Sequence, residues 1–122
     1  MKPITFLVAI TTVAVILSTV RAMPGGWQPI KNTNDERVKM VGQYAVYVYN
    51  FKNDYKNPLR LVNVRSGQIQ FVNGVNYRLI ITVAPTYGLD SEGIVYGTEV
   101  SVSPDRNTAG LKYFAPINKG LN

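Results

Sequence analysis

The sequence LRLVNVRSGQIQFVNGVNYRLIITVAP, which spans Leu59 to Pro85, decides the fold because Asn73-Gly74 divides it into two strand-like runs. Asn-Gly is typical of a tight hairpin turn, since both residue types tolerate a left-handed backbone. Residues 75–85 alternate apolar and mostly polar side chains, so one face of the predicted hairpin must pack against another element. The alternation in residues 59–70 breaks around Ser66-Gly67, which predicts a β-bulge there.

The segment before the hairpin predicts an amphipathic helix that begins near Thr33. Thr33 and Glu36 have the spacing of a capping box, and Asn34 and Asp35 are also favourable N-caps. The apolar residues that follow are three or four positions apart, which places them on one helix face: Val38, Val41, Tyr44, Ala45, Val48 and Phe51. The Asn-Pro pair at residues 57–58 is expected to lie beyond the end of the helix.

Shorter strand-like segments flank the helix and hairpin. Gly25 and Gly26 precede Trp27 and Pro29, which predicts a flexible arm leading into a short edge strand. Residues 93–103 and about 111–116 predict two further strands. The inward residues of the first of these are expected to be Ile94, Tyr96, Val100 and Val102. The whole pattern predicts an α+β domain in which a curved antiparallel β-sheet of four to five strands wraps one long α-helix.

The first 22 residues have the pattern of a secretory signal peptide. Lys2 precedes an apolar run from Ile4 to Val20, and Val20 and Ala22 provide small residues for a signal peptidase. A membrane anchor is the alternative, but Ser and Thr dilute the run at Thr5, Thr11, Thr12, Ser18 and Thr19. We therefore expect a signal peptide at 1–22, one domain at 23–122, no membrane contact of the mature form, and a secreted, extracellular or vacuolar destination.

The charge of the chain is moderately basic and scattered. The whole chain has 13 Lys and Arg against 7 Asp and Glu, for a net charge of +6. Removal of Lys2 and Arg21 with the signal would leave 11 basic residues and a net charge of +4. Because the basic residues form no stripe, nucleic acid is not expected as a partner, whereas affinity for acidic cell-wall polymers stays open.

The chain lacks the residue types on which most enzymes depend. Without Cys or His it has no thiol nucleophile, no imidazole base, no disulfide and no ordinary zinc site. Asp35 and Glu36 fit a helix start, where negative charge is favourable. Other carboxylates lie in loop-like stretches, at Asp54, Asp90, Glu92 and Asp105. We expect neither enzymatic activity nor a bound metal or cofactor.

Four segments, in this order, resemble the cystatin family and together span essentially the whole of residues 23–122. They are Gly25-Gly26-Trp27-Gln28-Pro29-Ile30, Val41-Gly42-Gln43-Tyr44-Ala45-Val46 with Tyr49-Asn50, Gln70-Phe71-Val72-Asn73-Gly74, and the loop at Pro104. The second is similar to the helix signature of plant cystatins, Leu/Val-Ala/Gly-x-Phe/Tyr-Ala-Val. The third matches the family's Gln-x-Val-x-Gly hairpin at every fixed position. A signal peptide without disulfides also resembles plant cystatins (phytocystatins) more than secreted animal ones.

The resemblance implies a cystatin-like fold and a reversible, non-covalent, competitive inhibitor of papain-like (C1 family) cysteine proteases. Such an inhibitor is a monomer that inserts a three-part wedge into the active-site cleft, and plant defence is one use of it. The implied protease-binding residues are Gly25 and Gly26 of the arm, Gln70, Phe71, Val72, Asn73 and Gly74 of the first hairpin loop, and Pro104 and Asp105 of the second hairpin loop.

Individual roles follow from the chemistry of these residues. Glycines in the arm permit close approach to the cleft wall, and Gly74 permits the tight turn. Val72 offers an apolar contact, while Gln70 is expected to hydrogen-bond to the loop or to the enzyme backbone. Trp27 is expected either to pack against the sheet or to contact the protease.

Asp105 departs from the family pattern, because the second loop of cystatins usually carries Pro-Trp and this chain has Pro104-Asp105. Loss of an aromatic anchor implies weaker binding and selectivity among proteases. The same departure supports an alternative, a secreted binding module that keeps the fold but docks acidic cell-wall polymers instead of inhibiting a protease.

Overall fold

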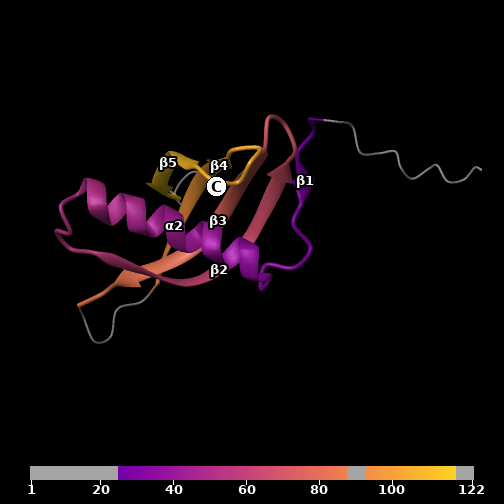
Figure 1. The fold of residues 1–122 in the computed structure, drawn as a ribbon. Coiled ribbons are helices and arrows are strands. Elements are labelled where there is room, and N and C mark those ends of the chain that lie inside the picture. Colours follow the sequence, from indigo (N-terminus) through magenta and orange to yellow (C-terminus); the bar gives the residue numbers. More distant parts are fainter. Residues whose placement is uncertain (1–24, 88–92, 118–122) are drawn as a thin grey trace, which may run out of the picture.

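In the part of the chain that the structure describes, a single helix lies across one face of a five-stranded sheet (Figure 1). The computed structural model describes residues 25–87 and 93–117, so the expected signal peptide at 1–22 lies outside the described residues. In chain order the elements are β1 (Gln28–Pro29), α2 (Glu36–Lys52), β2 (Leu59–Gln70), β3 (Val75–Pro85), β4 (Ile94–Val102) and β5 (Ala109–Pro116). The predicted α+β architecture is confirmed. Within the described ranges, no helix has the length and hydropathy to cross a membrane.

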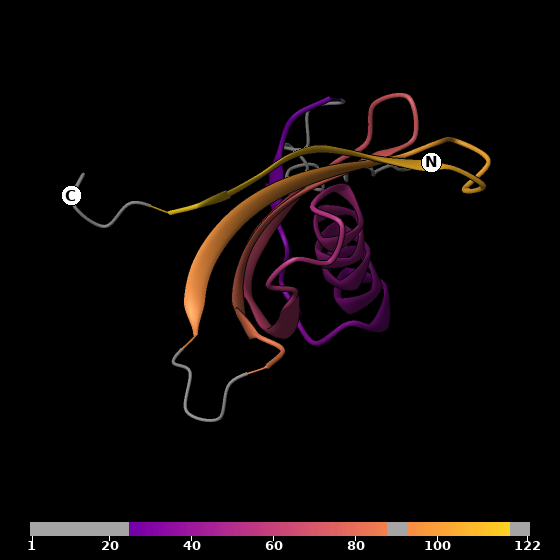
Figure 2. The same ribbon diagram turned by 90° about the vertical axis from the view of Figure 1, so that its left-hand side faces the viewer.

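The sheet has the strand order β1-β2-β3-β4-β5, and each neighbouring pair is antiparallel. The β2–β3 hairpin has two register shifts, between Leu61 and Asn63 and between Val64 and Ser66. The predicted bulge is therefore present but begins slightly earlier than Ser66-Gly67, and a second one precedes it. Bulges bend a strand and increase its twist. Figure 2 shows the result, a sheet that curves around α2.

The helix begins later than the capping-box pattern predicted. Asp35 is the N-cap, with the extended backbone dihedrals φ −59° and ψ 137°, and its side chain accepts a 2.8 Å hydrogen bond from the Arg37 amide. Asn32 instead accepts from the Asn34 amide, so the residues before Asp35 form a turn rather than the first helical turn. Asp35 is a favourable N-cap for two reasons. Its carboxylate accepts a hydrogen bond from a backbone amide that has no partner within the helix, and its negative charge complements the helix dipole.

The inner face of α2 and the concave face of the sheet form one core. Val38, Val41 and Ala45 are buried as predicted, together with Val46. Their partners on the sheet are mainly the alternating residues of β3: Val75, Tyr77, Leu79, Ile81 and Val83. Burial of each large side chain contributes about 1.5 to 3 kcal/mol before conformational entropy is subtracted. Tyr44 reaches the edge strand β5, where its hydroxyl donates a hydrogen bond to the Ala109 carbonyl at 2.9 Å.

Two residues predicted to face inward are exposed instead. Phe51 has 62% of its surface exposed, because Val46 and Asn50 occupy the inner face of the last helical turns and leave Phe51 rotated outward against Tyr47. Ile94 is also exposed, since it is the first residue of β4 and lies at the end of the sheet. Inside β4 the fully buried positions are Val100, as predicted, and Thr98, whose hydroxyl donates to the Tyr113 carbonyl at 2.7 Å.

Candidate functional site

All three segments implied by the resemblance lie at the same end of the sheet (Figures 1 and 2). We call them together the three-segment edge, defined by Gly25 and Gly26, by Gln70, Phe71, Val72, Asn73 and Gly74, and by Pro104 and Asp105. The first loop lies between the other two segments and contacts both, through the Gln70 side chain on one side and Gly74 on the other. Residues that are as many as 80 positions apart in the sequence, Gly25 and Asp105, thus belong to one surface.

The first loop presents an apolar tip on a tightly turned backbone. Asn73 and Gly74 both have a positive φ, of 52° and 102°, which matches the turn predicted from the Asn-Gly pair. Phe71 and Val72, just before this turn, have 58% and 41% of their surfaces exposed. Exposed aromatic and branched side chains on a short loop provide apolar area for a partner to bury.

Gly74 also permits the two hairpin loops to touch. A Cβ atom at this position would overlap the carbonyl oxygen of Val102 and lie 3.0 Å from the Pro104 nitrogen. The turn pattern alone predicted glycine here for its backbone conformation. The structure adds a second requirement, because only glycine lets the first loop pack directly against the start of the second.

Gln70 joins the first loop to the arm. Its side-chain Nε2 donates a 2.6 Å hydrogen bond to the Gly25 carbonyl, while its Oε1 accepts from Asn76 Nδ2 at 3.0 Å. Gly25 has a φ of 88°, and a Cβ placed on it would contact the Val72 side chain at 3.4 Å. Of the two roles expected for Gln70, the structure therefore has the amide bonded within its own chain rather than free for another protein. The participation of Asn76 was not foreseen.

Trp27 packs against this protein's own sheet. The guanidinium carbon of Arg78 lies 4.0 Å from the centroid of the Trp27 ring, which is a cation–π contact. Arg78 Nε also donates to Glu99 Oε1 at 3.1 Å, and Lys112 approaches the other oxygen of Glu99 at 3.9 Å. The arm is consequently anchored on the side of the sheet opposite the helix, immediately after its two glycines.

Asp105 organises the second loop. Its Oδ1 accepts hydrogen bonds from the Ser103 hydroxyl at 2.6 Å and from the Asn107 amide at 2.9 Å. The Ser103 bond, followed by that from the Asn107 amide, lowers the pKa of this carboxyl below its ordinary value, because both bonds favour the charged form. Arg106 follows with a φ of 65°, a left-handed residue in the same turn. The carboxylate thus shapes the loop tip where an aromatic residue would project.

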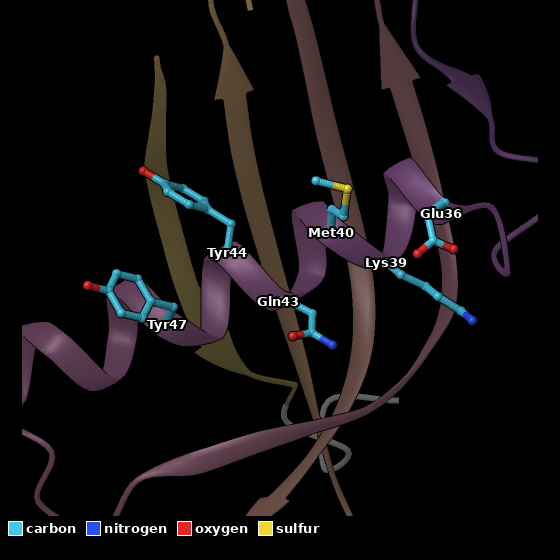
Figure 3. Close-up of a pocket in the computed structure, with 6 residues that line it drawn as sticks. All are labelled: Glu36, Lys39, Met40, Gln43, Tyr44 and Tyr47. Carbon is cyan, nitrogen blue, oxygen red and sulfur yellow. The ribbon is translucent and has the colours of Figure 1, made fainter. Parts of the chain in front are cut away.

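A hollow on the outward side of the helix has no relation to this edge. It is an open groove of about 650 Å³ along the outward side of α2, lined by Glu36, Lys39, Met40, Gln43, Tyr44 and Tyr47 (Figure 3). In Figure 3 these side chains fan out from the helix without converging on a common point. Over residues 25–87 and 93–117, His, Cys, Asp and Glu nowhere gather in a group of three or more that suits a metal ion.

Sequence comparison relates the chain to proteinase inhibitors of two kinds, one described as acting on aspartic and the other on cysteine proteinases. Residues 30–116 match the model of the SQAPI family, described as an aspartic acid proteinase inhibitor. Cysteine proteinase inhibitor 5 of Arabidopsis thaliana is 32% identical over 96% of this chain and 94% of its own length. Cysteine proteinase inhibitor 6 of Oryza sativa subsp. japonica is 36% identical over 87% of this chain and 94% of its own length.

Solved structures support the same relationship at the level of the fold. A salivary cystatin from the soft tick Ornithodoros moubata superposes with a TM-score of 0.64 at 17% identity, covering 79% of this chain and all of the tick protein. Dimeric human cystatin F has the same TM-score at 19% identity, with coverages of 81% and 91%. The chain therefore belongs to the cystatin family, with a SQAPI domain over residues 30–116 and plant cysteine proteinase inhibitors among its relatives.

Proposed function

We propose that this protein is a reversible, non-covalent, competitive inhibitor of papain-like cysteine proteases, and that the three-segment edge enters the active-site cleft. One observation carries the proposal: the arm, the first loop and the second loop are joined by direct contacts at one end of the sheet, with Phe71 and Val72 exposed between them. The names of the plant relatives, which are cysteine proteinase inhibitors, support the choice of protease class.

The inhibition requires no reaction by the inhibitor. The wedge fills the approach to the catalytic thiol, and the tight first loop keeps its peptide bonds out of attacking distance. Burying Phe71 and Val72 in the cleft is favourable, but it supplies less than the about 1.5 to 3 kcal/mol of a fully exposed side chain, because each is already partly covered. Because the loop is closed by the pairing of Gln70 with Asn76 at the end of the hairpin, little conformational entropy is lost on docking.

The second loop is proposed to contribute less than the other two segments. Asp105 is exposed and hydrogen-bonded within its own loop. At this position the protease would therefore meet a solvated carboxylate instead of an aromatic side chain. Aromatic anchors at interfaces often contribute about 2 kcal/mol or more. We therefore expect weaker and more selective inhibition than a cystatin with Trp at this position would give.

The description of the SQAPI family favours a second candidate, inhibition of an aspartic proteinase. No residue of the three-segment edge would interact specifically with a catalytic cysteine. The geometry of the edge alone therefore does not distinguish cysteine from aspartic proteases as the target. The polymer-binding alternative has no comparable support, since neither the family description nor the names of the relatives refer to polysaccharide.

Titration of active-site-counted papain with residues 23–122 tests the main proposal. We expect stoichiometric inhibition that reverses on dilution, with intact inhibitor recovered by mass spectrometry. A parallel titration of pepsin tests the second candidate at the same inhibitor concentrations. Full activity of papain and of related enzymes at micromolar excess of folded inhibitor would contradict the main proposal, and inhibition of pepsin alone would transfer the function to the second candidate.

We also propose that the protein is exported as a monomer after cleavage between Ala22 and Met23, and that it serves plant defence. The small residues at positions 20 and 22 support this cleavage site. Expression of the full chain in plant cells followed by mass spectrometry of the medium tests it, with Met23 expected at the N-terminus. Retention of residues 1–22 in the cells would contradict export.

A further inference from the structure

Two outward-facing side chains of β3 are linked to the arm, Asn76 through the Gln70 side chain of β2 and Arg78 through its contact with Trp27. Asn76 and Arg78 are two positions apart, so they lie on the same face of the strand, and β3 pairs them with Gln70 and Gln68 of β2. Neither residue belongs to the three-segment edge. From them we propose that Asn76 and Arg78 are positioning residues that hold the glycine arm ready for the protease, an inference that rests on the proposed inhibition.

Asn76 acts through the orientation of the Gln70 amide. Asn76 Nδ2 donates to Gln70 Oε1 at 3.0 Å and also approaches the Val72 carbonyl at 3.4 Å. With its oxygen thus occupied, Gln70 must direct its Nε2 toward the Gly25 carbonyl, where the 2.6 Å bond forms. A donor at position 76 therefore determines that a donor, and not an acceptor, faces the arm.

Arg78 fixes the point at which the arm leaves the sheet. Its guanidinium stacks on Trp27 at 4.0 Å, and Glu99 holds the same group through the 3.1 Å bond to Nε. β1 itself has only two residues, Gln28 and Pro29, which pair with Ile69 and Gln68. A strand of two residues forms few backbone hydrogen bonds with β2 and therefore holds the arm only weakly. The contact between Trp27 and Arg78 supplies a second attachment.

A fixed arm should bind more tightly than a free one. Segments that are ordered before docking avoid the entropy cost of being ordered at the interface. The Gly25-Gly26 pair would otherwise be among the most mobile parts of the chain, because glycine restricts the backbone least. By ordering the arm before binding, the two β3 side chains thus reduce the entropy cost that would otherwise be subtracted from the favourable contacts between the arm and the protease.

The deciding variant, Asn76→Asp, replaces a donor by an acceptor of the same size. The Gln70 amide must then turn its Nε2 toward the new carboxylate and present Oε1 to the Gly25 carbonyl, which cannot donate to it. We expect the complex with papain to dissociate about three- to tenfold faster, as loss of one hydrogen bond predicts. Trp27 is the only tryptophan, so its fluorescence anisotropy in the free protein should fall at the same time. Asn63→Asp, at an exposed position of β2, adds the same charge and is the matched control.

A double-mutant cycle separates positioning from a general effect on the loop. In a Gln70→Ala background the Asn76→Asp change should have a clearly smaller effect on dissociation, because its route to the arm is gone and only the weak 3.4 Å approach to the Val72 carbonyl remains. Gln70→Glu is the second variant, since it keeps an acceptor for Asn76 but repels the Gly25 carbonyl. Arg78→Gln should lower the Trp27 anisotropy without altering the Gln70 cycle. Thermal unfolding of every variant checks that the domain is folded.

The outcomes are distinguishable. Equal dissociation rates and equal anisotropy for Asn76→Asp and Asn63→Asp would overturn the inference while leaving the inhibition intact. An undiminished effect of Asn76→Asp in the Gln70→Ala background would overturn it as well. If the unaltered protein does not inhibit papain, the proposed function fails, and the Trp27 anisotropy alone then decides whether Asn76 and Arg78 order the arm.

Discussion

The α-carbon of Gly74 lies so close to the carbonyl oxygen of Val102 that a methyl group on Gly74 would overlap that oxygen. This contact joins the two hairpin loops, because Val102 is the last residue of β4 and the second loop begins directly after it. The glycine that turns the first loop therefore also sets its distance from the second. The two loops behave as one surface, and a change at residue 74 affects both.

Gly74→Ala is expected to damage stability and inhibition together. The positive φ of 102° alone costs a residue with a side chain about 1 to 3 kcal/mol, and the overlap with Val102 adds to it by displacing the second loop. We expect a lower free energy of unfolding in urea and an inhibition constant for papain raised by at least about tenfold.

The matched control for this variant is Gly110→Ala. A Cβ at Gly110 would meet no atom within 4 Å, so the same chemical change there should leave both unfolding and inhibition almost unaltered. Equal behaviour of the two variants would show that the contact between the loops has no energetic weight.

Asp105→Trp is expected to strengthen inhibition. The side chain at 105 is exposed at the tip of the second loop, where an indole can be buried by the protease. A gain of one aromatic anchor corresponds to an inhibition constant lower by about tenfold to a hundredfold. Asp105→Asn serves as the control, because its amide oxygen can still accept from Ser103 and Asn107. An unchanged constant for Asp105→Trp would show that the second loop does not reach the enzyme.

Much of the fold could be predicted because local signals agreed with each other. The Asn73-Gly74 turn, the alternation in β3 and the apolar spacing of Val38, Val41 and Ala45 all indicated the same core. Errors arose where signals competed. Thr33, Asn34 and Asp35 all favour N-caps, and Asp35 becomes the cap because the residues before it form a turn closed by the bond from the Asp35 amide to the Asn32 carbonyl.

The candidate site was predictable as a set of segments but not as a set of contacts. Family-like motifs identified the arm and the first loop, and the structure places them together. The bonds of Asn76 and Arg78 depend on the register of β3 against β2, which no local pattern in these residues specifies. Whether the predicted residues bind a protease stays a prediction.

Acid titration tests the geometry of the second loop. The Ser103 hydroxyl and the Asn107 amide lower the pKa of Asp105, so the folded protein holds this carboxylate charged to a lower pH than the unfolded chain. Its stabilising effect is therefore fully present above the ordinary value of 3.8 and is lost as the pH falls through the lower, folded pKa. An NMR titration of the Asp105 carboxyl carbon should show a midpoint below 3.8, and Ser103→Ala should raise it. A midpoint unaffected by Ser103→Ala would contradict the bonded loop.

Asn50→Ala should destabilise the domain more than any change on the outer side of α2. Asn50 is buried, and its side chain both accepts from the Leu59 amide at 3.0 Å and donates to the Leu59 carbonyl at 2.9 Å. This pair attaches the last turn of the helix to the first residue of β2. Without it, two partly buried backbone groups lose their partners, which corresponds to about 2 to 4 kcal/mol of unfolding free energy.

The control is Gln43→Ala, because Gln43 is exposed on the same helix and its removal should cost less than about 0.5 kcal/mol. Urea unfolding followed by circular dichroism measures both variants. Inhibition by folded Asn50→Ala at low temperature should be unchanged, because Asn50 lies in the last turns of α2 and is not one of the residues of the three-segment edge. A large rise in the inhibition constant without loss of stability would contradict this prediction. It would mean that the end of α2 influences the conformation of the three-segment edge, which the contacts of Asn50 with Leu59 do not predict.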